Sequence, residues 1–302
     1  MDGLLYRLVL MPLALLPLRV LYWLSDVLYV LAYYVVRYRR KVTRCNLQRS
    51  FPDWDDHEIK SIERRYYHHM TDLLAEAVYG LRASPQKVLQ HYRVKNRELA
   101  NQYYEQGQSI ILMSAHYNNW EFMVLSLGMQ FLHHGIGVGK PLDQKNMARL
   151  MTANRTRYGT QVVDQTDVRQ EMAYFEEHHV PCAYMMLGDQ SPSNAHRSHW
   201  TTFLNQDTAF LYGAEHFARK YHYPVLCYRV DKVRRGYYEV TLSELCTDID
   251  NTPEGEITER YARWLEATIN KQPEYWLWSH RRWKLRRDGR RIPKKEYCNT
   301  TP

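Results

Sequence analysis

A short, uninterrupted apolar run near the middle of the chain limits the fold more than any other feature of the sequence. Residues 109–115 read Ser-Ile-Ile-Leu-Met-Ser-Ala, with no charged or large polar side chain. Such a run is typical of a strand that is buried on both faces, as in a parallel sheet covered by helices. Comparable short runs predict further strands at residues 135–139, 160–163, 180–187, 223–230 and 237–242.

Helical segments separate most of these predicted strands. The spacing of apolar residues predicts helices at residues 53–80, 120–131, 145–158, 167–178, 208–221 and 258–271, and a further helical stretch begins at Ser84-Pro85. Residues 45–51 are interpreted as a short polar link. Strands that alternate with helices predict an α/β fold, with a mainly parallel sheet flanked by helices.

The N-terminal segment is the most hydrophobic part of the chain. Residues 4–36 are mostly Leu, Val, Tyr and Trp, and only Arg7, Arg19 and Asp26 are charged. The best window, residues 20–36, is at the short end of what spans a bilayer, and Asp26 in its middle would need a partner. A basic cluster at residues 37–41 suits a cytoplasmic boundary with anionic head groups. We therefore expect residues 1–41 to be a membrane anchor, spanning or half-inserted; the alternative is a long core helix of a soluble protein.

Composition excludes several classes of protein. The 302 residues are 45% hydrophobic and 25% charged, which rules out a mostly disordered chain. The five cysteines lie far apart without a CxxC pair, which argues against a disulfide framework or a structural zinc module. The 41 Lys and Arg exceed the 33 Asp and Glu by eight, a net charge that suits nucleic acid, anionic lipid or an acidic protein.

The strongest chemical signal is a histidine followed five residues later by a glutamate. His116 comes directly after the buried strand predicted at 109–115, at a position where open α/β sheets build their sites. A carboxylate bonded to one imidazole nitrogen frees the other to take a proton from a hydroxyl. On one ideal helix the two side chains would point about 140° apart, so His116 must lie in the turn before the helix if Glu121 is to meet it. An isolated match of this kind is more often a capping histidine beside an exposed glutamate.

Three further stretches accompany residues 116–121: Asn-Leu-Gln-Arg-Ser-Phe-Pro at 46–52, Gly-Asp-Gln-Ser-Pro at 188–192, and Pro-Glu-Tyr-Trp-Leu-Trp-Ser-His-Arg-Arg-Trp-Lys at 273–284. Together the four stretches resemble the lipid A late acyltransferases, the lauroyl and myristoyl transferases of lipopolysaccharide biosynthesis. These belong to the HX4(D/E) glycerolipid acyltransferases, so the resemblance implies that type of α/β fold. It covers nearly the whole chain in the family's order. With this resemblance, residues 42–288 are expected to form the acyltransferase domain, and residues 289–302 a flexible basic tail.

The resemblance implies direct transfer of an acyl chain from an acyl carrier protein thioester to a hydroxyl of a lipid A precursor. No covalent enzyme intermediate and no cofactor other than the thioester co-substrate is expected. His116 would be the general base and Glu121 the group that orients it. The enzyme would be bound to the cell inner membrane with its catalytic domain on the cytoplasmic side. The sequence has no Gly-x-Ser-x-Gly elbow that would indicate a nucleophilic serine.

The substrate-binding candidates lie in or beside these stretches. Lys140 stands in a Gly-Lys-Pro sequence where the family typically has arginine before proline, and lysine lacks the bidentate fork of arginine. Asp189 and Gln190 follow the apolar run at 180–187, where they would align the acceptor, brace the catalytic pair or form a plain turn. The remaining candidates are Asn119, Arg155, Thr208 and Arg281.

Several alternatives stay open from the sequence. The same chemistry could act on an aminolipid or a glycosylated phospholipid, and the donor could be coenzyme A. A non-enzymatic membrane or nucleic-acid-binding protein could use the basic, Trp-rich segment from residue 276 onward. We expect anionic lipids and an acidic carrier protein as partners rather than nucleic acid, because the N-terminus is hydrophobic. Adjacent histidine pairs, as at His68 and His69, point about 100° apart on a helix, so we expect no metal site. Acyl chain length and oligomeric state do not follow from these residues.

Overall fold

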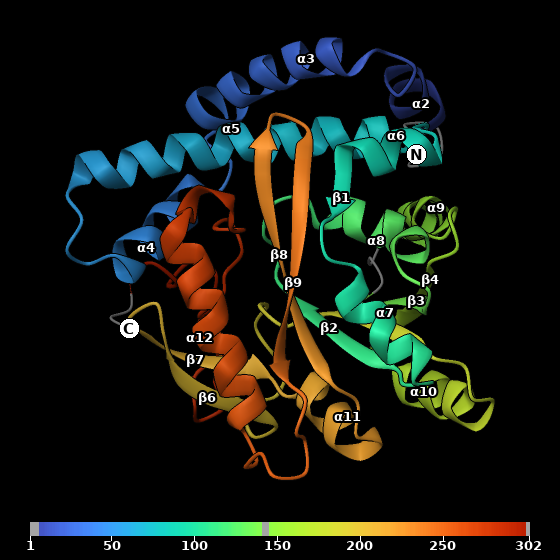
Figure 1. The fold of residues 1–302 in the computed structure, drawn as a ribbon. Helices are drawn as coiled ribbons and strands as arrows, with labels where there is room; N and C mark the ends of the chain where they lie inside the picture. Colours follow the sequence, from blue (N-terminus) through green and yellow to red (C-terminus); the bar gives the residue numbers. More distant parts are fainter. Residues whose placement is uncertain (1–5, 141–144, 300–302) are drawn as a thin grey trace.

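The fold is built around a seven-stranded sheet (Figure 1). The computed structural model describes residues 6–140 and 145–299. The strands of this sheet, in spatial order, are β1 (Tyr92–Val94), β9 (Tyr237–Cys246), β8 (Val225–Arg234), β2 (Ile110–Ser114), β5 (Cys182–Leu187), β3 (His134–Gly139) and β4 (Gln161–Asp164). All neighbours are parallel except β8 and β9, which form an antiparallel hairpin. The predicted α/β fold with a mainly parallel sheet is confirmed.

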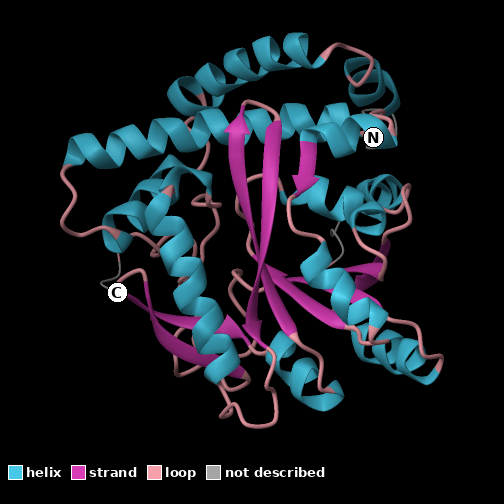
Figure 2. Ribbon diagram, viewed as in Figure 1, coloured by secondary structure: helices cyan, strands magenta, loops and turns pink. Residues whose placement is uncertain are grey.

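Helices cover both faces of this sheet (Figure 2). In the central strand β2, Ile110 and Leu112 belong to one core, whereas Ile111 and Met113 belong to the other. All four side chains are buried, which is why the sequence here is continuously apolar. The helices are α2 (Met11–Leu13), α3 (Leu18–Val30), α4 (Arg40–Ser50), α5 (Asp56–Gly80), α6 (Pro85–His91), α7 (Glu98–Glu105), α8 (Trp120–Gln130), α9 (Lys145–Arg155), α10 (Val168–Glu177), α11 (Gly213–Tyr221) and α12 (Glu256–Lys271). Short helical turns are η1 (Tyr6–Leu10), η2 (Leu31–Val35) and η3 (Pro273–Tyr275).

Two sequence-based assignments are wrong. Residues 45–51 are not a link, because most of them belong to α4, where the Asn46 side chain donates to the carbonyl oxygens of Trp278 and His280 at 2.8 and 2.9 Å. Residues 208–211 are not the start of α11; they lie in β7 (Gln206–Leu211), which pairs with β6 (Ser198–Phe203) as a separate two-stranded sheet. In both places contacts with distant segments outweigh the preference of the local sequence.

The C-terminal segment lies against the body as far as it is described. We expected residues 289–302 to form a flexible basic tail, but Tyr297 is fully buried. Its hydroxyl donates to Asn46 Oδ1 at 2.8 Å and accepts the backbone N–H of Trp283 at 3.2 Å. These bonds join the end of the chain to α4.

The hydrophobic N-terminal helix packs along α5 rather than projecting away from the body (Figure 1). It consists of α3 and η2, and Leu18–Val35 is the one described helical segment long and apolar enough to cross a membrane. Only 17% of this segment is buried, so it is not a buried core helix of the folded body. Asp26, the charge in its middle, bonds to the guanidinium of Arg235 at the tip of the β8–β9 hairpin. The partner that Asp26 was expected to need is therefore part of the folded body.

Candidate functional site

The site begins where two neighbouring parallel strands end. Ser114, the last residue of β2, is paired with Leu187, the last residue of β5. His116 and Asp189 each follow two residues later, so the strand register alone brings these two side chains out side by side. This is the carboxyl edge of the sheet, the usual place for a site in an open α/β fold.

His116 and Asp189 form a tightly bonded pair. His116 Nδ1 lies 2.7 Å from Asp189 Oδ1, and the backbone N–H of His116 donates to Oδ2 at 3.0 Å. The indole N–H of Trp276 also donates to Oδ2, at 2.9 Å. Burial acts to raise the pKa of Asp189, but the positive charge of a protonated His116 and these hydrogen bonds outweigh it and hold the pKa below its usual value. The carboxylate is therefore ionised at neutral pH.

An ionised carboxylate at Nδ1 sets the tautomer of the imidazole. Nδ1 carries the proton and donates a hydrogen bond to Asp189, which leaves Nε2 as the basic nitrogen. The side-chain amide of Gln190 lies 3.1 Å from Nε2 and donates to it. The His116 side chain is 18% exposed, so a substrate hydroxyl can reach the ring. This is the arrangement of a general base with an orienting acid.

Gly188, the residue before Asp189, allows the ends of β2 and β5 to pack closely against the buried side chain of Tyr261. A Cβ atom at this position would lie 2.8 Å from Cε1 of Tyr261, which is closer than carbon atoms pack. The Tyr261 hydroxyl in turn donates to the carbonyl of Ser114 at 2.7 Å. The glycine of the Gly-Asp-Gln stretch is thus required by packing directly beneath the His116–Asp189 pair.

Glu121 does not have the contact that we expected. It lies in the first turn of α8, where its two carboxylate oxygens accept from Arg155 Nε at 3.0 Å and from the terminal nitrogen at 2.5 Å. The group bonded to His116 Nδ1 is Asp189, so the orienting role assigned to Glu121 is corrected. The two side chains are separated by the turn at residues 117–119. His116 lies beside the end of β5, whereas Glu121, in the first turn of α8, faces Arg155 of α9. Glu121 and Arg155, both predicted as site residues, are brought together as a bidentate ion pair.

Asn119 holds the turn between His116 and Glu121. Its side-chain oxygen accepts the backbone N–H of Phe122 at 2.9 Å and thereby caps α8. Its amide donates to Glu76 at 2.6 Å, and the side chain is buried. Asn119 was predicted to bind substrate, but in this structure its polar atoms are engaged within the protein.

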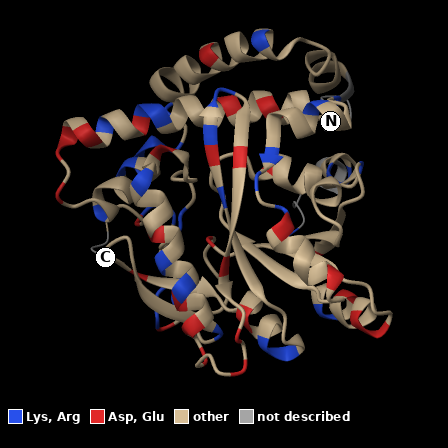
Figure 3. Cartoon of the chain, in the orientation of Figure 1, with Lys and Arg blue, Asp and Glu red and all other residues tan. Residues whose placement is uncertain are grey.

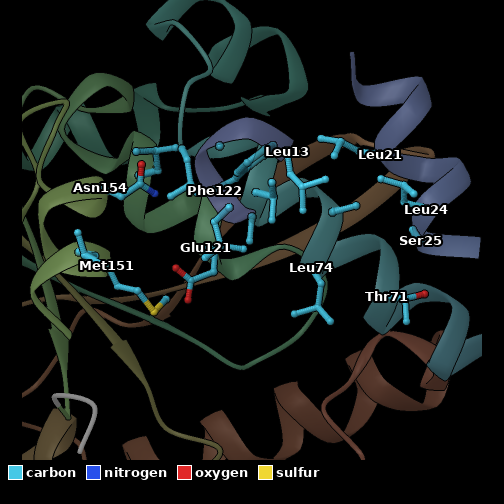
Figure 4. A pocket seen from close by; sticks show the side chains of 18 of the residues that line it. Leu13, Leu21, Leu24, Ser25, Thr71, Leu74, Glu121, Phe122, Met151 and Asn154 are labelled. Carbon is cyan, nitrogen blue, oxygen red and sulfur yellow. The ribbon is translucent and has the colours of Figure 1, made fainter. Parts of the chain in front are cut away.

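An apolar cavity of about 440 Å³ lies between the N-terminal helices, α5 and the start of α8 (Figure 4). Leucines from α3 and α5, among them Leu21, Leu24 and Leu74, form much of its wall. Glu121 and Arg155 supply its main charged groups, and His116 is not among the residues that line it. The HX4E segment therefore contacts this cavity through its glutamate, while the histidine lies on the other side of the turn.

The chain is similar to known proteins over nearly its whole length. The model of the bacterial lipid A biosynthesis acyltransferase family matches residues 2–285. The chain belongs to this family. It is 24% identical over 280 residues to a lipid A biosynthesis lauroyltransferase of Escherichia coli, an alignment that covers 91% of this chain and 88% of the relative. It is 26% identical over 255 residues to a lipid A biosynthesis acyltransferase of Haemophilus influenzae, covering 83% and 79%. The predicted family and the acyltransferase class of enzyme are thereby confirmed.

The other predicted residues of this acyltransferase form no hydrogen bond with His116 or Asp189 among the described residues. Thr208 is buried in β7 and accepts the indole N–H of Trp283 at 2.7 Å, which is a packing role. Lys140 is exposed directly after β3, and the proline that follows it lies outside the described residues. Arg281 is half-buried, with its guanidinium carbon 6.0 Å from the centre of the Tyr297 ring.

Sequence reasoning missed two residues of this site. Trp276 was read as part of a basic aromatic surface, yet its indole N–H bonds the carboxylate beside His116. A buried indole N–H needs a hydrogen-bond acceptor, and this requirement could have indicated that Trp276 bonds a buried polar group. Glu76 was not singled out, although it continues the buried stripe of α5 that includes Ile59, Ile62 and Tyr66. A carboxylate in such a stripe must find donors, and Glu76 finds them in Asn119, after His116, and in Tyr22 of α3.

Among the described residues, one group of side chains has the spacing of a metal site: Asp26, His68 and Asp72. Both carboxylates are already bonded to the guanidinium of Arg235, and Asp72 also lies 3.4 Å from the ammonium group of Lys232. These cations supply the positive charge that a metal would bring.

Proposed function

We propose that this acyltransferase moves a fatty acyl chain from an acyl carrier protein thioester to a hydroxyl of a lipid A precursor. The observation that carries the proposal is the bonded pair of His116 and Asp189 at the carboxyl edge of the sheet in a chain of this family. The names of the two relatives support the lipid acceptor and an acyl donor. The excess of eight positive charges suits an acidic carrier protein.

In the proposed reaction His116 Nε2 takes the proton of the acceptor hydroxyl as its oxygen attacks the thioester carbonyl. Gln190 must release Nε2 for this step, because its amide holds the nitrogen in the free protein. Asp189 stays ionised and stabilises the imidazolium that forms. The carbon–sulfur bond then breaks, and the imidazolium returns the proton to the leaving thiolate. The products are the acylated lipid and a free thiol, with no acyl-enzyme intermediate.

Glu121 and Arg155 are assigned to binding in this scheme. Their ion pair supplies the charged groups of an otherwise apolar cavity of about 440 Å³, which suits an acyl chain with its polar end near the pair. Lys140 and Arg281 are assigned to anionic groups of the donor or acceptor, because neither forms an ion pair with a carboxylate among the described residues. Membrane attachment through the N-terminal helix, with the body on the cytoplasmic side of the inner membrane, completes the proposal.

The test uses the purified full chain with each acyl donor and acceptor in turn. Acyl carrier protein and coenzyme A thioesters are combined with a lipid A precursor, a hydroxylated aminolipid or a glycosylated phospholipid, and products are identified by mass spectrometry. We expect transfer from the carrier protein to the lipid A precursor. Transfer only to another acceptor, or only from coenzyme A, would contradict that part of the proposal.

The mechanism is tested separately with two histidine variants. His116→Ala should abolish transfer while the variant stays folded, and His57→Ala is the matched control, since His57 is exposed in the first turn of α5. Near wild-type turnover by His116→Ala would refute the general-base role.

A further inference from the structure

The N-terminal helix α3 is bonded to the folded body by polar side chains along its inner face. Ser25 donates to Asp72 of α5 at 2.9 Å, and Tyr22 donates to Glu76 of the same helix at 2.8 Å. Asp26 bonds Arg235 of the β8–β9 hairpin at 3.2 Å. Three polar anchors within two turns fix the orientation of α3 relative to α5 and the sheet.

The outer face of α3 and η2 is apolar and exposed. Val20, Trp23, Val27, Leu31 and Tyr34 recur every three or four residues and form one stripe, in which Trp23 is 65% exposed. Figure 3 shows that this helix is almost free of charge, in contrast to α5 beneath it. A contiguous apolar surface of this length requires a partner.

Exposed positive charge surrounds this stripe. Arg19 lies at its start, Arg37, Arg39 and Lys41 follow its end, and Arg234 lies at the hairpin tip that touches α3. None of these five side chains forms a salt bridge within the described residues. Val233, also at the hairpin tip, is 61% exposed. An apolar stripe with a cationic rim fits the surface of a bilayer that contains anionic lipids.

We propose that α3 lies in the plane of the membrane, with its outer face in one leaflet, and does not span the bilayer. This inference rests on the membrane association proposed above and adds the orientation of the helix. The β8–β9 hairpin tip contacts the same leaflet through Val233 and Arg234.

Two ways of spanning the bilayer conflict with the contacts of α3. If α3 crossed the bilayer while docked, α5 and the hairpin would be drawn in with Asp72, Glu76 and Arg235. Charged groups are costly at the bilayer centre, where they lose their hydration. If α3 left the body and crossed alone, Asp26 would be in the hydrocarbon without Arg235, and Asp72 would lose its bond from Ser25.

The in-plane position also explains how lipid chains reach the cavity. Leu21, Leu24 and Leu28 of α3 line one wall of the 440 Å³ cavity, and Leu13 of α2 continues that wall. A helix lying in the leaflet places this wall at the level of the acyl chains. A lipid chain then enters from the leaflet without crossing water.

The experiment compares the two ends of the helix in a Cys298→Ser background, in which the other four cysteines are buried. Arg19→Cys and Tyr38→Cys lie about 28 Å apart along a helix, which is close to the thickness of the hydrocarbon core. Lys220 is exposed on α11 at the opposite end of the body, so Lys220→Cys shows on which side of the membrane the catalytic domain lies. A membrane-impermeant maleimide is applied to spheroplasts and to inverted inner-membrane vesicles.

We expect all three positions to react only in inverted vesicles. Reaction of Arg19→Cys in spheroplasts and of Tyr38→Cys and Lys220→Cys in inverted vesicles would show a spanning helix and overturn the inference. Recovery of the unmodified chain in the supernatant after high-speed centrifugation would overturn membrane association itself. Acyl transfer by each variant confirms that the labelled protein is folded.

Discussion

Replacing Asp189 with asparagine tests the corrected site most directly. In the wild type, Oδ2 accepts two N–H groups, from His116 and Trp276, while Oδ1 accepts the proton on Nδ1. Asparagine has a single oxygen, and the two fixed N–H donors will hold it on their side. Its NH2 group then faces Nδ1, which forces the imidazole proton onto Nε2 and removes the base.

The size of the expected fall in kcat follows from the cost of turning the asparagine amide into its other orientation. Turning the amide to restore the correct tautomer leaves two buried donors without an acceptor, at about 1–3 kcal/mol each. Loss of the negative charge beside the imidazolium adds to this cost. Together they predict a fall in kcat of about 10³–10⁴-fold for Asp189→Asn, or about 4–5.5 kcal/mol at 1.36 kcal/mol per factor of ten.

The assay is single-turnover acyl transfer from a labelled thioester, with folding checked by circular dichroism. Trp276→Phe is the matched control, because it removes one donor to the same carboxylate and should cost about tenfold or less. Glu121→Gln should leave the pH profile of kcat unchanged, since Glu121 does not contact the imidazole in this structure. A folded Asp189→Asn variant within tenfold of the wild type, together with a shifted pH profile in Glu121→Gln, would refute this reasoning and restore Glu121 as the orienting acid.

Three further outcomes follow from the surrounding structure. Gly188→Ala should lower the free energy of unfolding by about 1–3 kcal/mol in a denaturant titration, because its Cβ would meet Tyr261 at 2.8 Å; an unchanged midpoint would contradict this. Burial raises the pKa of Glu76 to about 7 from 4.5, so the wild type should lose stability as pH rises between these values, and Glu76→Gln should lack this slope in titrations at pH 5 and pH 8. Glu121→Gln and Arg155→Gln should each lower kcat/KM, and the double variant should be no worse than the poorer single variant; additive losses would show that the ion pair does not act as a unit.

The sheet could be predicted from the sequence because its strands are buried on both faces. A run such as residues 109–115 fits few other structures, because it is apolar throughout and shows neither the helical nor the alternating pattern of a half-exposed element. Helix α4 and strand β7 were assigned wrongly because their local sequences are polar or mixed. Asn46 holds α4 through carbonyl groups more than 200 residues away, and Thr208 lies in β7 against Trp283. Neither contact leaves a periodic signal.

The sequence singled out the residues that form the candidate site in the structure, but not which of them bond to one another. His116, Glu121, Asp189, Gln190 and Arg155 were all singled out, yet the sequence alone does not say that β2 and β5 are neighbours. That adjacency, across a strand order of β8-β2-β5-β3, decides which acid lies beside the histidine. The HX4E spacing suggests a pair because its two members are close in sequence. The fold instead pairs the histidine with an acid 73 residues away.

One buried carboxylate links the N-terminal helix α3 to the turn that carries His116. Glu76 accepts from Tyr22 of α3, from Tyr238 of β9 and from Asn119, which caps α8 directly after His116. Removing α3 would take away one of the three donors that stabilise Glu76 as well as one wall of the apolar cavity. The conformation of the turn and the closure of the cavity therefore depend on the same docked helix. The cavity is closed and Glu76 keeps its three donors only when α3 lies against α5, the position in which we propose that its outer face contacts the membrane.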